Sequence, residues 1–460
     1  MNTDLRRFLA DLEARFPQSV LRIKEPIDHQ AFEATALLKD LEERGEERIV
    51  LFENVRDLTG KPSPFPLLMN LFVSRRHCAM ALGLPPEAHR MELSTEFAKR
   101  EERRGSCVEV ARGQAPVKEI VWTGKDADVR RLPIPMHHAD DVAPYLTMIC
   151  VMKGLSGNFY DATYTKNMVQ GGNRMSLSAH RHHHLDRIVQ EYEAAGKSAP
   201  VAIVLGHHPA FSLGTCALDP FGVNDYEMIA RFLDAPLRLT PSETWGADFL
   251  VPADAEIIVE AEVLPGVRAN QNPFGEIAGY YQEVMSMPVV EVRAITARQN
   301  GLFESIFPGH PEHWNLGGIP KEGSVYNSIK RTIPGLTAIH LPPSGCCRFT
   351  AYLSLKKGFE SDPRKAAMQA FVEMPNLKWA VVVDEDVDVF NEREVLWAVA
   401  TRTWWEQDLQ IIDKVQSFRG WLGSSVAIID ATRPRDRSFP KKNEIPEEAL
   451  RKIRARGLLA

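Results

Sequence analysis

The sequence has no long apolar run and no excess of basic residues. No stretch approaches the roughly 20 apolar residues that a membrane-spanning helix needs. The first residues, MNTDLRRFLADLEARF, alternate charged and apolar side chains at helical spacing, unlike a signal peptide. Lys and Arg number 55 against 61 Asp and Glu, so no surplus of cations exists to follow a phosphate backbone. We expect a cytoplasmic protein with no membrane segment and no nucleic-acid partner.

Several common chemical motifs are also missing. The dinucleotide motif GxGxxG, the P-loop GxxxxGK[ST] and the hydrolase elbow GxSxG do not occur, so the usual nucleotide cradles are unsupported. The six cysteines form no CxxC pair and no regular framework. We therefore interpret them, including the adjacent Cys346 and Cys347, as reduced packing residues of a reducing compartment.

A chain of 460 residues is too long for one compact core and predicts two or three domains. Residues 1–125 combine amphipathic helical patterns with strand-like runs, which predicts an α/β domain. Residues 126–302 follow a Pro-rich stretch and consist mainly of apolar strands, with helices expected only at 187–195 and 225–233. Residues 303–460 again alternate helix and strand and predict a second α/β domain. The predicted fold class is therefore α+β and multidomain.

The strongest local signal is the segment QNPFGEIAGYY, residues 271–281, in which Pro and Gly fix the backbone on either side of Glu276. From residue types alone, a tight turn between strands with a solvated glutamate is favoured over a functional carboxylate.

A second group of polar residues could converge on a divalent ion. Asp161, the histidines of the segment HRHHH at 180–184, Asp225 and Glu227 supply carboxylates and imidazoles from separate segments. No spacing among them is diagnostic, and such a histidine run is as often a solvated loop or the start of a helix. Only one of the histidines needs to be a ligand.

Three motifs in the correct order resemble the UbiD family of reversible decarboxylases over nearly the whole chain. The family loop EGPFGE-x-x-GYY is present as QNPFGEIAGYY, its VPADAE motif as residues 251–256, and its VVVDEDVDxFN…WAxxTR segment as residues 381–402. The resemblance implies an N-terminal α/β domain, a central split β-barrel that binds flavin, and a C-terminal α/β domain with the contacts of a homodimer or higher homo-oligomer.

The resemblance also implies the cofactors and their ligands. It implies prenylated FMN supplied by a separate flavin prenyltransferase, with manganese or magnesium, and potassium as a possible third ion. The metal ligands carried over are Asp161, His184 and Asp225, with Glu227 as an alternative to Asp225. The residues carried over for cofactor binding are Asp161, Thr163, Lys166, His184, Thr215 and Cys216.

The family's catalytic Glu-Arg-Glu set corresponds here to Gln271, Lys166 and Glu276, of which only Glu276 is unchanged. Together with the metal ligands Asp161 and Asp225, these residues still supply three carboxylates and one cation. We therefore interpret the chain as an active enzyme whose site charges have changed position, in preference to an inactive relative. The implied activity is removal of carboxylate from an aromatic, heteroaromatic or α,β-unsaturated acid, with Glu276 as proton donor. Lys166 and Gln271 are expected to act as a coupled pair.

Two alternatives from other classes stay open. The chain could be a non-catalytic flavin-binding or assembly subunit that kept the fold and lost the working pair. It could also use the same flavin pocket for another step, such as that of a hydratase or isomerase.

Overall fold

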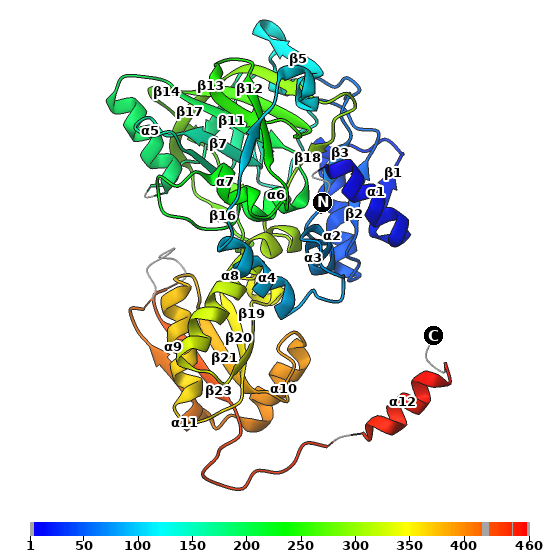
Figure 1. The fold of residues 1–460 in the computed structure, drawn as a ribbon, viewed down its shortest axis with the longest axis vertical. Helices are drawn as coiled ribbons and strands as arrows, with labels where there is room; N and C mark the ends of the chain where they lie inside the picture. The colour runs from blue at the N-terminus through cyan, green and yellow to red at the C-terminus, as the bar shows by residue number, and fades with distance from the viewer. Residues whose placement is uncertain (1–3, 182, 416–422, 444, 458–460) are drawn as a thin grey trace.

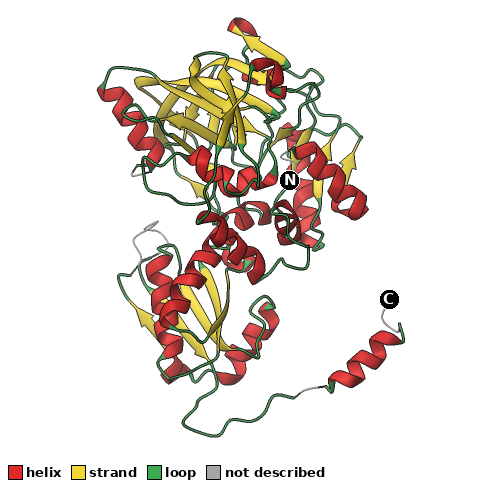
Figure 2. Ribbon diagram, in the orientation of Figure 1, coloured by secondary structure: helices red, strands yellow, loops and turns green. Residues whose placement is uncertain are grey.

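The computed structural model describes residues 4–181, 183–415, 423–443 and 445–457. Its N-terminal part is an α/β unit in which helices pack on a small sheet of order β1-β2-β3-β18 (Figures 1 and 2). The elements are α1 (Leu5–Arg15), β1 (Val20–Ile23), α2 (Glu33–Glu43), β2 (Ile49–Phe52), β3 (Leu67–Met69), α3 (Arg75–Ala81), α4 (Met91–Glu101) and β18 (Phe303–Glu304). The Asp4 side chain caps α1 by accepting a hydrogen bond from the Arg7 amide. The apolar face of α1 is buried. The predicted α/β domain is confirmed.

The central part is built on a curled antiparallel sheet of order β6-β9-β10-β17-β14-β11-β7-β8, with β5 paired to β17. Its strands are β5 (Ile120–Thr123), β6 (Tyr145–Leu146), β7 (Ile149–Lys153), β8 (Tyr160–Tyr164), β9 (Asn167–Val169), β10 (Arg174–Leu177), β11 (Ala199–Leu205), β14 (Ile257–Gln271) and β17 (Met285–Ala297). A smaller sheet joins β4 (Cys107–Glu109), β12 (Leu237–Ser242) and β13 (Gly246–Pro252). The β-rich central domain is confirmed.

Three short helices cover this region. Two lie where they were predicted, α5 (His184–Ala194) and α7 (Asp225–Ala230), and the third, α6 (Pro209–Gly214), was not predicted. Every residue of α6 is buried, so its sequence has no polar face and therefore no amphipathic period.

Strands β14 and β17 form a long hairpin that carries the Glu276 segment. They pair from Ile257 opposite Ala297 to Gln271 opposite Met285. The chain between them folds back as a second, small hairpin of β15 (Phe274–Gly275) and β16 (Tyr281–Gln282). The long hairpin thus delivers this turn to the side of the sheet that faces the C-terminal part.

The C-terminal part is a separate sheet of order β19-β20-β21-β23-β22 flanked by helices (Figure 2). The elements are α8 (Pro311–Thr332), β19 (Leu336–His340), β20 (Thr350–Leu355), α9 (Asp362–Glu373), β21 (Trp379–Asp384), α10 (Glu392–Arg402), α11 (Trp405–Asp408), β22 (Leu409–Ile412) and β23 (Val426–Ala431). The predicted second α/β domain is confirmed. Helix α12 (Glu447–Ala455) lies on an extended tail away from the body (Figure 1).

Helix α8 connects the parts through a buried charge cluster. Glu322 on α8 pairs with Arg75 of α3 at 2.7 Å and with His340 of β19 at 2.9 Å. Burial by itself would raise the pKa of Glu322, but Arg75 and His340 lower this pKa to about 2. The cluster therefore fixes α8 between the N-terminal and C-terminal parts.

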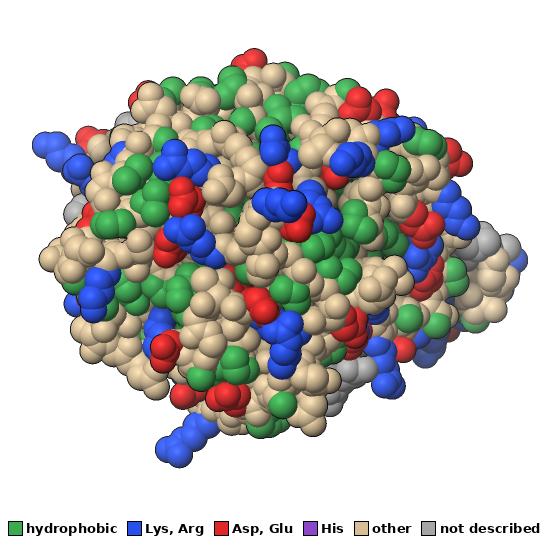
Figure 3. All heavy atoms as spheres, turned by 90° about the horizontal axis from the view of Figure 1, so that it is seen from above, with side chains coloured by type: hydrophobic (Ala, Val, Ile, Leu, Met, Phe, Trp, Pro, Cys, Tyr) green, Lys and Arg blue, Asp and Glu red, His purple; other side chains and the backbone are tan. Residues whose placement is uncertain are grey.

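The surface seen from above carries acidic and basic side chains intermingled, without one large basic patch on that face (Figure 3). In the described part of the chain, no helix is both long enough and apolar enough to cross a bilayer.

Candidate active site

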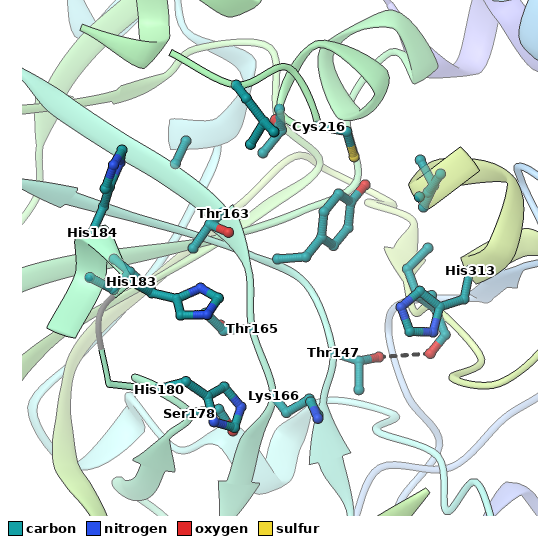
Figure 4. A pocket seen from close by; sticks show the side chains of 18 of the residues that line it. Thr147, Thr163, Thr165, Lys166, Ser178, His180, His183, His184, Cys216 and His313 are labelled. Carbon is teal, nitrogen blue, oxygen red and sulfur yellow. Dashed lines mark hydrogen bonds between the residues drawn. The ribbon is translucent and has the colours of Figure 1, made fainter. Parts of the chain in front are cut away.

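A cavity of about 570 Å³ lies where the central sheet, helices α6 and α7, the small β15–β16 hairpin and helix α8 meet. Figure 4 shows His184 and Thr163 on one side of it, His313 on the opposite side and Lys166 near its base. Its volume is in the range typical of small-molecule and cofactor sites. Most of the predicted site residues line it.

The predicted metal ligands gather at one corner of the cavity. The ring Nδ1 of His184 lies 2.9 Å from the Asp161 carboxylate, which projects from β8. Asp225, at the start of α7, accepts a hydrogen bond of 2.7 Å from the backbone amide of Ala162, the neighbour of Asp161. Glu227, the alternative ligand, is exposed and lies outside the cavity lining, so Asp225 is the better candidate.

Burial dominates the electrostatics of this corner. Burial raises the pKa of Asp161, although the nearby His184 acts to lower it. Burial, and then repulsion from Asp161, raises the pKa of Asp225 to about 8. Two adjacent buried carboxyls with an imidazole are a donor set whose charge a divalent cation would balance.

The corner therefore fits a metal ion in its chemistry, although its side chains are not gathered around one point. Within residues 4–181, 183–415, 423–443 and 445–457, no three His, Cys, Asp or Glu side chains are already grouped to hold a metal ion. His180 and His183 also line the cavity, whereas His182 lies outside the described residues.

Glu276 occupies the turn of the small hairpin and faces the cavity. Its amide donates to the Tyr280 carbonyl at 2.8 Å, which closes the tight turn expected from the sequence. Gly275 is required next to it, because a Cβ there would overlap the His138 ring. The residue types alone suggested a solvated glutamate, but the Glu276 side chain is buried. The residue is 8% exposed and forms an ion pair with Lys166.

Lys166 follows β8 and makes more than one contact. Its ammonium donates to Glu276 and, at 3.1 Å, to the side-chain oxygen of Gln282, and it lies 5.3 Å from the centre of the Phe274 ring. Gln282 was not predicted. It directly follows the GYY motif, and that position is the only signal that could have identified it.

Gln271 is fully engaged by other partners. Its Oε1 accepts from the Ser178 hydroxyl at 2.6 Å, and its Nε2 lies 3.2 Å from both the Ser176 hydroxyl and the backbone carbonyl of Lys166. The residue is 2% exposed and does not line the cavity. Gln271 thus contacts Lys166 through its backbone carbonyl, while the Lys166 ammonium pairs with Glu276, and the expected coupling of the two residues stays a prediction.

The remaining cofactor candidates also line the cavity. Thr163 projects from β8, and Thr215 and Cys216 follow α6. The Thr215 hydroxyl already donates to the Phe211 carbonyl at 3.0 Å, which leaves its lone pairs to accept. Burial raises the pKa of the Cys216 thiol to about 12, so this thiol is not a nucleophile.

Two cations that the sequence reasoning missed complete the lining. Lys321 lies on α8, and Arg348 lies in the loop between β19 and β20. Neither belongs to a motif. The Gly317-Gly318 and Cys346-Cys347 pairs beside them are the sequence features that could have drawn attention to them.

Comparisons with known proteins agree along most of the chain. Family models for the N-terminal, Rift-related and C-terminal domains of 3-octaprenyl-4-hydroxybenzoate carboxy-lyase match residues 13–97, 108–311 and 314–419. The anhydromevalonate phosphate decarboxylase of Methanothermobacter thermautotrophicus is 30% identical over 395 residues, which are 84% of this chain and 89% of that protein.

Solved structures show the same relationship. An evolved dimeric form of the UbiD-class enzyme HmfF from Pelotomaculum thermopropionicum, in complex with prFMN, matches with a TM-score of 0.88 and 32% identity over 97% of this chain and 98% of that one. The 3,4-dihydroxybenzoic acid decarboxylase of Enterobacter cloacae matches with a TM-score of 0.87 and 26% identity over 98% and 99%. The chain therefore belongs to the UbiD family and is a carboxy-lyase with the three-domain architecture of that family.

Proposed function

We propose that this carboxy-lyase removes carbon dioxide, without net oxidation, from an aromatic, heteroaromatic or α,β-unsaturated carboxylic acid, using prenylated FMN and manganese or magnesium. One observation carries the proposal. The Lys166–Glu276 ion pair and the Asp161–His184 pair line the same cavity, so a proton donor and a cation site lie within reach of one bound molecule.

The residues present fit the cofactor. Asp161, His184 and Asp225 would hold the metal ion against the flavin phosphate, while Thr163 and Thr215 offer hydroxyl groups nearby. When bound, the prenylated flavin supplies the electron sink that no amino-acid side chain can provide for the bond to the departing carboxylate.

The chain's own contribution is to hold the acid and to return a proton. The ammonium of Lys166 attracts the substrate carboxylate, and a carboxylate that takes over this ammonium leaves Glu276 without its cation. Glu276 can then take up a proton more easily, because Phe274 and Ile277 beside it are buried and apolar. Glu276 gives this proton to the carbon that lost carbon dioxide.

The test is to produce the chain together with a flavin prenyltransferase and identify the released cofactor by mass spectrometry. Carbon dioxide release is then measured with cinnamate-like, furoic, hydroxybenzoic and branched unsaturated acids, including anhydromevalonate phosphate. Stoichiometric prenylated FMN with turnover of at least one acid is expected. Prenylated FMN without any turnover would favour the non-catalytic subunit, and absence of flavin would refute the proposal.

We also propose that the chain is a homodimer or a higher homo-oligomer. The C-terminal part exposes large apolar side chains on several elements, including Phe359 (73%), Val372 (81%) and Ile411 (66%). Light scattering on the eluting protein tests this, and a monomer at micromolar concentration would contradict it.

A further inference from the structure

Lys321 and Arg348 bring positive charge to the α8 side of the cavity. Both line it, together with Leu316, Gly317 and His313 of α8. In Figure 4, α8 with His313 lies opposite His184 and the proposed metal corner. The charge of this wall is therefore separate from that of Lys166, which is held by Glu276 and Gln282.

The fold makes specific room for Arg348. A Cβ on Gly317 would lie only 2.6 Å from the Arg348 Nη2 atom, so glycine allows the guanidinium to pass along the helix. The loop that carries the arginine is held in an unfavourable backbone conformation. Cys346 and Cys347 have φ values of 53° and 49°, in the left-handed region that residues with a Cβ rarely adopt. Such local strain occurs preferentially where a binding group must be positioned.

Lys321 lies beside this arginine without a matching anion. Among the described residues, it has no carboxylate within ion-pair distance, whereas the neighbouring Glu322 is committed to Arg75 and His340. Burial, and next the charge of Arg348, lowers the pKa of Lys321 to about 7. An anion bound between the two cations would relieve their repulsion and restore the charge of Lys321.

We propose that Lys321 and Arg348 form a subsite for a second anionic group of the substrate, a phosphate or a carboxylate, in addition to the carboxylate that is removed. This inference rests on the proposed function, because it assumes that an acid substrate occupies the cavity. The substrate would then be a dianionic acid, with its reacting carboxylate toward Lys166 and its other anion toward α8.

The flavin phosphate is the other possible source of such an anion. We favour the substrate because the oxygen and nitrogen donors for a phosphate-bridging metal come from β8, α5 and α7, on the other side of the cavity from α8. The related decarboxylase of Methanothermobacter thermautotrophicus is named for anhydromevalonate phosphate, a compound that carries both a carboxylate and a phosphate. A guanidinium with an adjacent ammonium is a suitable receptor for a phosphate group.

The experiment compares four variants of the full chain purified with its flavin. Lys321→Met removes one cation, Gly317→Ala displaces the Arg348 guanidinium without changing charge, and Lys321→Arg keeps the charge. Arg331→Met removes an exposed cation from the last turn of the same helix and serves as the matched control.

Three quantities are measured for each variant. They are flavin content, binding of inorganic phosphate by calorimetry, and the ratio of kcat/KM for anhydromevalonate phosphate to that for its dephosphorylated acid. Lys321→Met and Gly317→Ala are expected to weaken phosphate binding at least tenfold and to lower the ratio similarly. Flavin content should stay unchanged, and Lys321→Arg and Arg331→Met should resemble the wild type.

The outcomes separate this subsite from the proposed function. Flavin loss in Lys321→Met with unchanged phosphate binding would assign the cations to the cofactor and overturn the inference. Wild-type protein that binds no phosphate at millimolar concentration would also overturn it. If neither acid is turned over, the choice of substrate fails, but phosphate binding in the variants still decides whether the subsite exists. If Lys321→Met does not fold, Gly317→Ala and Lys321→Arg give the answer.

Discussion

Restoring the family glutamate at position 271 should harm this protein and harm it more as pH rises. The Gln271 amide group donates to the Lys166 carbonyl and the Ser176 hydroxyl, both at 3.2 Å, and an ionised carboxylate can donate to neither. At about 0.5–1.5 kcal/mol for each hydrogen bond, Gln271→Glu loses about 1–3 kcal/mol when ionised. The Lys166 carbonyl keeps a bond of 3.0 Å from the Ser178 amide, so it is not left without a donor.

The sign of the pH dependence follows from burial. The introduced carboxyl would lie where Gln271 is 2% exposed, which favours its protonated form and raises its folded-state pKa above the unfolded value of about 4.3. Protonated, it can donate to one of the two lost partners. The variant should therefore be about 1 kcal/mol less stable than wild type below pH 4, and the deficit should grow as pH rises through the folded-state pKa.

The assay is the urea midpoint of wild type and variant at pH 4, 5, 6, 7 and 8. Gln170→Glu, which introduces the same charge at an exposed position of the central domain, is the control. A variant as stable as wild type at pH 8, or one with faster turnover, would refute the reasoning. It would show that the Lys166 ammonium leaves Glu276 and pairs with the new carboxylate.

Four other substitutions give further tests. Glu276→Gln should retain flavin yet lower carbon dioxide release by about 10² to 10⁴, and a fall smaller than tenfold would remove Glu276 as proton donor. Asp161→Ala and His184→Ala should each lower bound metal and flavin together, and elemental analysis that finds full metal in both variants would contradict the ligand assignment. Burial raises the pKa of Glu312 to about 7, so the folded state keeps a proton that the unfolded state releases near pH 4.5. The free energy of unfolding should therefore fall as pH rises from about 4.5 to about 7. Glu312→Gln should flatten this part of the urea-midpoint profile, and an unchanged slope would contradict the buried acid as its source.

The fold was predictable where the sequence carried a clear period. The apolar runs that became β11, β14, β17 and β21 are bounded by turn residues and have strand length, so they were recognised correctly. Helix α6 was missed because all of its residues are buried. The strand order of the central sheet was beyond local reasoning, since it joins segments far apart in the chain, such as β10 with β17.

The site was predictable only in its motif residues. Glu276 was found because Pro, Gly and Tyr surround it in a recognisable order, whereas its environment depended on Lys166, 110 positions away. Sequence resemblance also aligned Gln271 with a catalytic glutamate, but could not show that two serines surround its side chain. Lys321 and Arg348 meet at the cavity only because two glycines of α8 admit the loop after β19.

The charges of the cavity argue for a working site in preference to a decayed one. A buried charge that loses its partner is strongly destabilising, so a site drifting without function would be expected to lose its buried charges altogether. Here Glu276 keeps Lys166, Asp161 keeps His184, and Gln271 has three hydrogen-bond contacts. The replaced residues are thus integrated into new contacts. Their effect is that the Lys166 ammonium pairs with Glu276, which ties the release of the proton donor to the arrival of a substrate carboxylate.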